Sequence, residues 1–310
     1  MQCIVVPLDG SAASELALPM AIDLAQRSGA ELHVVRVHVP QEHYSGIALL
    51  YEPLDEGARR DKIAYLESHQ NSLSAGGSVS VKTALLSGNP AIAISEYVQR
   101  MAADLVVLTS HGRGGFSRFW LGSVADDLLR RMSVPTVLMR IRDGATTSSP
   151  PAPIQRILVP LDGSPLAEEV LGSAERLAQL YQAELVLLEV VAPIADQHAA
   201  LDITSPVDLG PVSFEMDQVQ QQLETQADSY LHTVAERVRG FGLKVTTELV
   251  IRGQTANAIL ESAQRLKADM IAMATSGRGG VARAFFGSVA DKVIRGAVLP
   301  MLIQPVPRRN

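Results

Sequence analysis

The sequence has one cysteine, few aromatic residues and no surplus of positive charge, and each shortage argues against a class of protein. Cys3 alone provides neither an intrachain disulfide nor a cysteine-based zinc cluster, which suits a reducing compartment, and we expect it to be a buried strand residue. The 27 basic and 33 acidic residues give a net charge of −6, which leaves no excess of cations to neutralise a phosphate backbone. Aromatic residues make up 4% of the chain, too few for a base-stacking platform. We therefore expect no nucleic-acid partner.

Long hydrophobic runs are also missing. Although 47% of the residues are hydrophobic, no apolar run approaches the roughly 18 to 20 residues that a membrane helix requires. The amino terminus reaches Pro7 and Asp9 without a basic stretch, so it has no visible secretion signal. We expect a soluble, cytoplasmic protein without a membrane partner, and 310 residues at roughly 150 per domain allow two domains.

The chain repeats itself, which is the main clue to its organisation. One motif recurs after 153 residues (159 − 6), whereas two later motifs recur after 165 residues (277 − 112 and 287 − 122). The pairs are Val-Pro-Leu-Asp-Gly-Ser at 6–11 and 159–164, Gly-Arg-Gly-Gly at 112–115 and 277–280, and Gly-Ser-Val-Ala-Asp at 122–126 and 287–291. The second half therefore carries a net insertion of 12 residues (165 − 153), and the proline- and glycine-containing stretch 193–217 is the loop expected to hold it.

Each half predicts an α/β domain. Residues 142–153 are small, polar and proline-rich, which is typical of a linker, so the predicted domains are 1–141 and 154–310. In both, short Val/Ile/Leu runs alternate with helical periodicity, as for the helices expected at 13–27 and 90–101. The expected strands are 3–7, 32–39, 79–86, 105–109 and 136–140, then 157–160, 185–191, 245–251, 270–274 and 301–304. The pattern predicts two tandem doubly wound parallel five-stranded sheets with helices on both faces.

Ligands of such sheets bind beyond the carboxyl ends of the strands, so the residues that follow the strands are the candidates. Asp9 and Asp162 follow the first strand of each half, where they either accept hydrogen bonds from a ligand or stabilise a turn. A glycine-rich loop follows the fourth strand and leads to a helix that begins at Gly122 or Gly287. Backbone amides at such a helix start suit a phosphate group; alternatively, the glycines serve only a turn with positive φ. Neither the P-loop spacing nor the dinucleotide fingerprint is present.

These motifs resemble those of the universal stress protein family in its tandem form. The family signature is Gly-2x-Gly-9x-Gly-[Ser/Thr], and its last two elements fit both halves, since nine residues separate Gly112 from Gly122 and Gly277 from Gly287. Thr109 and Ala274 replace the first glycine. The resemblance, which spans nearly the whole chain, implies an adenine-nucleotide alpha hydrolase-like, Rossmann-like fold that binds ATP, with or without Mg²⁺ held by the phosphates.

The resemblance also implies roles for individual residues. Asp9 and Asp162 would contact the adenine or ribose end of ATP, and the backbone at Val37 and Val190 would flank the adenine. The residues implied for the triphosphate and its surroundings are Gly112, Arg113, Gly115, Gly122, Ser123 and Val124 in the first half and Gly277, Arg278, Gly280, Gly287, Ser288 and Val289 in the second. The family further implies a homodimer and an intrachain pairing of the two domains through strands 136–140 and 301–304.

Three functions remain open at this point. The leading hypothesis is an adenine-nucleotide-binding stress-response protein that acts as a sensor or scaffold for unidentified protein partners, with little or no catalysis. No acidic residue occurs within 109–123 or 274–288, which argues against the alternative of a phosphohydrolase or adenylate-forming enzyme. We assign no catalytic residue and no metal ligand. The third function is that of a stress protein that has lost nucleotide binding. If both sites bind, we expect the first to be tighter, because Thr109, Ser110 and His111 add hydrogen-bonding groups.

Overall fold

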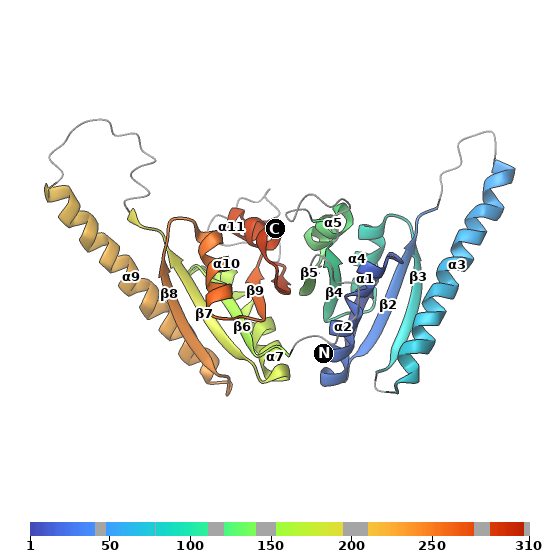
Figure 1. Cartoon of the computed structure of the whole chain (residues 1–310), viewed down its shortest axis with the longest axis horizontal. Helices are drawn as coiled ribbons and strands as arrows, with labels where there is room; N and C mark the ends of the chain where they lie inside the picture. The colour runs from blue at the N-terminus through green and yellow to red at the C-terminus, as the bar shows by residue number, and fades with distance from the viewer. Residues whose placement is uncertain are drawn as a thin grey trace. The chain divides into compact units, whose positions relative to one another are not determined.

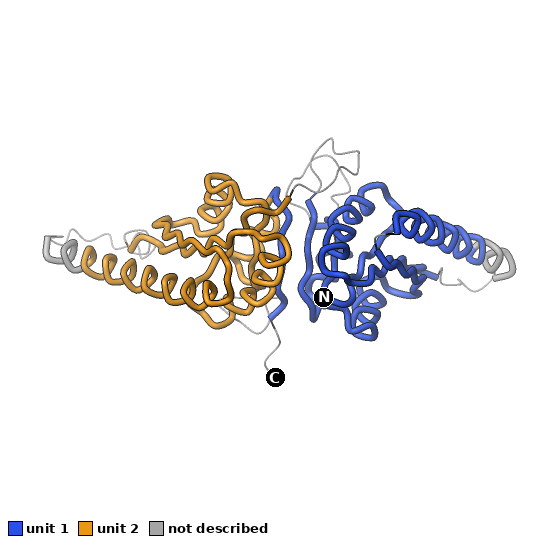
Figure 2. Tube along the Cα trace, turned by 90° about the horizontal axis from the view of Figure 1, so that it is seen from below, with its two compact units in different colours: residues 1–152, 298–309 blue, residues 153–297, 310 orange. Residues whose placement is uncertain are grey.

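The computed structural model describes residues 1–40, 48–77, 79–110, 121–140, 153–194, 210–275 and 286–306, with the side chains of 48–54 and 210–215 excepted (Figure 1). The chain forms two compact units. Unit 1 comprises Met1–Ala152 with Val298–Arg309, and unit 2 contains Pro153–Ala297 (Figure 2). The last strand is thus placed with unit 1, although its sequence belongs to the second repeat. The predicted linker lies outside the described residues except for Pro153.

The described residues of unit 1 form six strands in the order β3-β2-β1-β4-β5-β10. Its strands are β1 (Cys3–Pro7), β2 (Glu31–His38), β3 (Val81–Ser87), β4 (Leu105–Ser110), β5 (Thr136–Arg140) and β10 (Met301–Gln304), and its helices are α1 (Ala12–Glu15), α2 (Leu18–Ser28), α3 (Ala48–Ala75), α4 (Pro90–Arg100) and α5 (Ser123–Arg131). The first five strands pair in parallel. β10 pairs antiparallel with β5, with Met301 opposite Leu138, so the expected pairing of these two strands is confirmed.

The described strands of unit 2 follow the order β9-β6-β7-β8, which repeats that of β4-β1-β2-β3, and their three pairings are parallel. Its strands are β6 (Arg156–Leu161), β7 (Glu184–Val191), β8 (Val245–Ile251) and β9 (Met270–Ala274), and its helices are α6 (Pro165–Glu168), α7 (Leu171–Tyr181), α9 (Gly210–Arg239), α10 (Thr255–Arg265) and α11 (Ser288–Gly296). β6 occupies the place of β1, and β9 that of β4. From β1 the chain continues to β2 on one side, and it later returns to β4 on the other side; β7 and β9 flank β6 in the same way. This change of side creates the switch point at which ligands of doubly wound sheets bind.

Burial along the strands confirms that both faces of each sheet are covered. Ile4, Val5 and Val6 in β1 are all 0% exposed, as are Ile157, Leu158 and Val159 in β6. Successive strand residues point to opposite faces, so helices must cover the two sides. Cys3 is buried in β1 as expected, and burial raises the pKa of its thiol to about 11.

The structure corrects two helix boundaries. The helix expected at 13–27 is divided into α1 and α2, because the N–H groups of Leu16 and Ala17 bond three residues back and tighten the chain there. The stretch 193–217 was expected to be a loop, but α9 already begins at Gly210. Pro211 is compatible with this start because proline is tolerated in the first turn of a helix.

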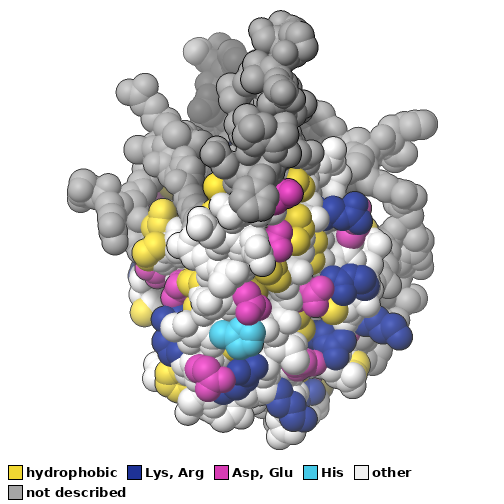
Figure 3. Space-filling model, turned by 90° about the vertical axis from the view of Figure 1, so that its left-hand side faces the viewer, with side chains coloured by type: hydrophobic (Ala, Val, Ile, Leu, Met, Phe, Trp, Pro, Cys, Tyr) yellow, Lys and Arg dark blue, Asp and Glu magenta, His cyan; other side chains and the backbone are white. Residues whose placement is uncertain are grey.

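Two features of the structure bear on its possible partners, namely the character of its helices and the charges on its surface. Within the described residues, no helix is both long and apolar enough to span a bilayer. Figure 3 shows one face on which acidic and basic side chains are interspersed. Unit 2 pairs such charges locally: Arg239 lies 2.6 Å from Glu236, and Arg265 lies 2.7 Å from Glu248.

Candidate functional site

The first part of the candidate site is the turn between β1 and α1, with its counterpart between β6 and α6. Asp9 Oδ1 accepts hydrogen bonds from the backbone N–H and the hydroxyl of Ser11, at 2.8 and 2.6 Å. Asp162 Oδ1 accepts the same pair of bonds from Ser164, at 3.0 and 2.6 Å. The turn-stabilising interpretation of the two aspartates is therefore confirmed. Their proposed contact with a ligand is a separate role that the described contacts do not test.

The same serines start the following helices. Ser11 Oγ accepts the N–H of Ser14 at 3.1 Å, and Ser164 Oγ accepts the N–H of Ala167 at 3.1 Å. An N-capping serine satisfies one of the donors that a helix start leaves unpaired. The Asp-Gly-Ser sequence thus builds the same rigid corner in both units. It leaves the carboxylates at the carboxyl edge of the sheet, with Asp9 exposed.

Gly10 is required at this corner in unit 1. Its φ is +89°, which side chains rarely adopt, and an added Cβ would lie 2.3 Å from Arg36 Nη2. Gly163 has the same kind of conformation, with φ of +75°. The repeated glycine is therefore explained by the backbone alone.

The second part of the site is the start of α5 and of α11. Gly122 is the N-cap of α5 with φ −60° and ψ 146°, and Gly287 is the N-cap of α11 with φ −60° and ψ 151°. These values are open to any L-residue, so the alternative that the two glycines serve a positive-φ turn is wrong. Because glycine has no side chain, neither helix start has a side-chain capping bond from its N-cap. The first-turn amides and the helix dipole at both positions suit an anion.

The residues that follow these glycines lie at the surface. Ser123 and Ser288, the first helical residues, are exposed, and Val124 is 45% exposed. Val289 is half-buried. In unit 2, Gly287 N–H donates to the Thr275 carbonyl oxygen at 2.8 Å, which ties the helix start to the end of β9. The strand end and the helix start are thus brought together, as the sequence predicted.

Several predicted site residues cannot be placed in this geometry. His111 and the glycine-rich loops lie outside the described residues. The predicted site residues in these loops are Gly112, Arg113, Gly115, Gly277, Arg278 and Gly280. Their proposed contacts with phosphate stay predictions.

Val37 and Val190 lie where the sheet opens at its carboxyl edge. β1 ends at Pro7, opposite Val35, and Leu8 N–H makes a last bond to the Val35 carbonyl at 2.8 Å. Val37 is two residues beyond that point and faces only Leu86 of β3 in the ladder. Val190 likewise lies one residue beyond Glu189, the last residue of β7 that pairs with β6. Their backbone position fits the proposed contact with a planar base.

The hydroxyl groups expected to strengthen the first site already have partners in the protein. Thr109 Oγ1 donates to the Ala13 carbonyl at 3.0 Å, and Ser110 Oγ accepts from Arg140 Nη1 at 3.0 Å. Thr109, which replaces the family's first glycine, therefore directs its side chain to α1. These hydroxyls are not evidence for a tighter first site, and that ordering stays a prediction.

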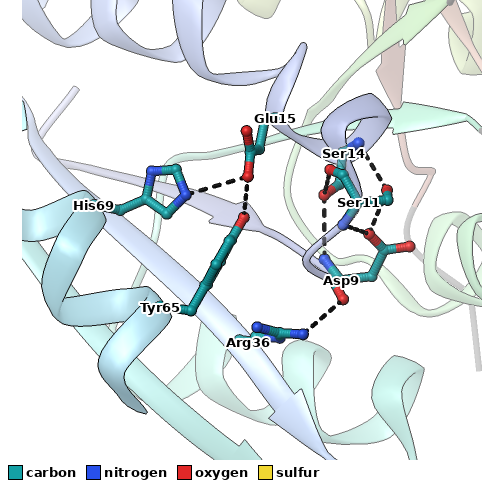
Figure 4. A network of polar contacts seen from close by, with 7 residues as sticks. All are labelled: Asp9, Ser11, Ser14, Glu15, Arg36, Tyr65 and His69. Atoms are coloured by element: carbon teal, nitrogen blue, oxygen red, sulfur yellow. Dashed lines mark hydrogen bonds and ion pairs between the residues drawn. The ribbon is translucent and has the colours of Figure 1, made fainter. Parts of the chain in front are cut away.

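Arg36 lies beside the β1–α1 turn of the candidate site, and sequence reasoning did not select it. Its Nη2 donates to the Asp9 carbonyl at 3.2 Å, and its guanidinium lies 4.5 Å from the centroid of the Tyr65 ring (Figure 4). Tyr65 in turn donates to Glu15 Oε1 at 2.6 Å. Burial, and next the bond to Glu15, raises the pKa of Tyr65, so its hydroxyl remains a donor. The repeat offset would have flagged Arg36, because the position 153 residues later (36 + 153) is Glu189, of opposite charge.

Among the described residues, no group of three or more His, Cys, Asp or Glu side chains could hold a metal ion. Asp126 and Asp291 are the acidic residues in the first turns of α5 and α11. Each forms an ion pair one turn along its helix, with Arg130 at 2.7 Å and with Arg295 at 3.0 Å. These ion pairs therefore stabilise the first turns of α5 and α11.

Comparison with known proteins gives one family for both halves. The model described as "Universal stress protein family" matches residues 1–140 and 153–305. A universal stress protein of Mycobacterium bovis is 28% identical over 310 residues, with 97% of this chain and 96% of that protein covered. One from Methanocaldococcus jannaschii is 31% identical over 156 residues, which cover 50% of this chain and 85% of that protein. The crystal structure of a universal stress protein from Archaeoglobus fulgidus aligns with a TM-score of 0.68 over 97% of both chains, at 21% identity, and so supports the fold.

Proposed function

Because the chain belongs to the universal stress protein family, with a match in each half, we propose that it is an adenine-nucleotide-binding stress-response protein. It acts as a sensor or scaffold, with little or no catalysis, and works in the cytoplasm. Nucleotide occupancy changes its preference for protein partners, and it forms a homodimer. The tandem arrangement provides one nucleotide site in each unit.

The observation that carries this proposal is the backbone at Gly122 and Gly287. Both glycines have conformations that any residue could adopt, yet neither position has the Ser, Thr, Asp or Asn side chain that commonly caps a helix start. A glycine is then useful for the space it leaves, since a ligand can approach the backbone closely. The amides of the following turn are the natural partners of a phosphate.

The other candidates fit the rest of an adenine nucleotide. Asp9 and Asp162 stand at the switch point, where a carboxylate can accept hydrogen bonds from ribose hydroxyls. The opened ladder at Val37 and Val190 presents backbone groups to the edge of the adenine. Mg²⁺, when it accompanies ATP, would be held by the phosphates and by water.

Binding without turnover is favoured over an enzyme by the charges of the site. Phosphoryl transfer needs an acid that holds metal and a group that positions the nucleophile. The sequence has no acidic residue within 109–123 or 274–288, and the first acids beyond, Asp126 and Asp291, are paired with arginines. The two loop sequences therefore offer no carboxylate to hold a metal ion or orient water at the phosphates.

Nucleotide that copurifies with the protein is the direct test. The protein is purified without added nucleotide and denatured, and the released small molecules are separated by chromatography and identified by absorbance. Calorimetric titration of nucleotide-free protein with ATP then gives the number of sites. We expect adenine nucleotide in the extract and up to two sites per chain. The absence of both released nucleotide and a binding isotherm at millimolar ATP would overturn the proposal. Several turnovers per second with Mg²⁺ would favour the enzyme.

A further inference from the structure

We propose that Arg36 makes the unit 1 site selective for the more highly charged nucleotides, whereas the unit 2 site, which has Glu189 at the same position, lacks this preference. This inference rests on the proposed nucleotide binding and specifies what distinguishes the two sites. It concerns the residue that lies behind the β1–α1 turn in unit 1 and behind the β6–α6 turn in unit 2.

Arg36 is held against the turn that carries Asp9. The guanidinium donates to the Asp9 carbonyl at 3.2 Å and packs so closely on Gly10 that a Cβ there would lie 2.3 Å from Nη2. The ring of Tyr65 supports it from the other side, at 4.5 Å from the centroid (Figure 4). A guanidinium is protonated at every physiological pH, so this corner has a fixed positive charge.

The corresponding corner of unit 2 has no positive charge at this position. Glu189 occupies the place of Arg36 in β7, as Glu184 occupies that of Glu31 at the start of the strand. Glu189 is only 7% exposed, and it lies near Tyr230, whose pKa is raised by burial first, then by Glu168 and to a smaller extent by Glu189. Whichever protonation state Glu189 adopts, it cannot offset the charge of Asp162. Unit 2 also has Arg237, which is paired with Glu168, so the exchange of Arg36 for Glu189 is the charge difference that lies directly behind the two turns.

The difference between Arg36 and Glu189 affects how each unit recognises the charge of the ligand and not how it recognises the base. A fixed positive charge partly neutralises Asp9, which would otherwise repel an anionic ligand, and the benefit grows with the number of phosphates. Adenosine, which is neutral, gains nothing from it. The ratio of ATP affinity to adenosine affinity should therefore be about fivefold to tenfold higher in unit 1 than in unit 2 at low salt. Salt screens the effect, so the difference should shrink as ionic strength rises.

The test measures adenosine, AMP and ATP binding to the full chain by calorimetry in low salt without divalent cations. Gly287→Val combined with Asp162→Ala removes both the proposed phosphate and the proposed ribose contacts of unit 2 and confines binding to unit 1, and Gly122→Val combined with Asp9→Ala confines it to unit 2. In the first background, Arg36→Gln removes the charge and Arg36→Lys retains it. We expect Arg36→Gln to weaken ATP binding about fivefold to tenfold while adenosine affinity stays unchanged, and Arg36→Lys to restore most of the ATP affinity. Melting temperatures of all variants verify that they are folded.

The outcomes separate this inference from the function on which it rests. If Arg36→Gln weakens adenosine and ATP by the same factor, Arg36 only positions the turn and the inference is overturned. Equal ATP-to-adenosine ratios in the two units overturn it as well, while nucleotide binding itself stands. If no ligand binds to the unsubstituted chain, both the proposed function and the inference fail.

Discussion

Tyr65 donates its hydroxyl hydrogen to Glu15 Oε1 over 2.6 Å, and Tyr230 makes the same bond to Glu168 over 3.0 Å in the other unit. The glutamates are 153 residues apart (168 − 15), but the tyrosines are 165 apart (230 − 65). Each Tyr–Glu pair thus joins the first helix of its unit to the long helix. In unit 2 the insertion lies between the two residues of the pair in sequence. This repeated contact indicates that α3 docks on α1 in the same way as α9 docks on α6.

Loss of the Tyr65 hydroxyl should destabilise unit 1. Tyr65→Phe keeps the ring that packs on Arg36 and removes only the bond to a carboxylate, so we expect a loss of about 1–2 kcal/mol in the free energy of unfolding. Denaturant titration, with Tyr230→Phe as the matched variant in unit 2, measures both losses. A change below about 0.3 kcal/mol in both variants would mean that water replaces the phenol without cost.

Asp104 and Asp269 accept hydrogen bonds from the backbone at the start of the first strand of each unit. Asp269 Oδ2 accepts the N–H groups of Gln155 and Arg156 at 2.8 and 2.9 Å, and Asp104 bonds Cys3 N–H at 3.1 Å. Asp269→Ala leaves both amides without this acceptor and should cost about 1.5–3 kcal/mol. Asp269→Asn, which keeps an acceptor oxygen, should cost less.

Hydrogen exchange locates the effect of Asp269→Ala. We expect faster exchange in β6 and its neighbours β7 and β9, with little change in β1 to β4, whereas Asp104→Ala should give the reverse pattern. Uniform acceleration in both units would contradict a local anchoring role.

Glu31 should make stability depend on pH. Bonds from Lys82 and then from His33 lower the pKa of this carboxyl from 4.5 to about 2. A carboxyl with a depressed folded-state pKa stabilises the fold above its unfolded value. That contribution is fully present above about pH 5 and declines as pH falls through 4.5 toward 2. The difference in melting temperature between the wild type and Glu31→Gln should therefore narrow over this range.

Lys82→Met supplies the control for this pH dependence. It removes the largest cause of the shift, so the remaining effect of Glu31→Gln should be smaller at neutral pH and should vary less between pH 5 and 3. An unchanged pH profile in Lys82→Met would show that another group causes the acid sensitivity.

Much of the fold could be predicted from the sequence because its patterns are local. Continuous apolar runs gave the strands, and the repeated Asp-Gly-Ser gave the turn and its N-cap. The role of Arg36 could not be predicted from one half alone, because it depends on a side chain in β2 that reaches the turn 27 residues earlier (36 − 9). The direction of the Thr109 hydroxyl was missed for a similar reason, since Ala13 lies 96 residues away in sequence. Contacts of this kind depend on tertiary packing, which periodicity does not encode.

Gly122→Val and Gly287→Val test the site most directly. The backbone at both glycines has φ −60° and ψ near 150°, which valine adopts without strain. Valine is a poorer N-cap than glycine, so we expect each variant to lose about 1 kcal/mol or less in stability. A β-branched side chain between the ligand and the amides should nevertheless abolish nucleotide binding in its own unit. ATP titration of ligand-free protein, together with its melting temperature, measures the two effects separately.

Gly10→Ala is the matched contrast for these variants. Gly10 has a φ of +89°, which alanine adopts only with strain, so this smaller change should cost about 1–3 kcal/mol. A mild loss of stability with loss of ATP binding at Gly122, beside a larger loss of stability at Gly10, is the pattern that a phosphate site at the start of α5 predicts. If Gly122→Val instead binds ATP as tightly as the wild type does, the amides of α5 do not contact the phosphates. The nucleotide would then have to lie elsewhere along the carboxyl edge of the sheet.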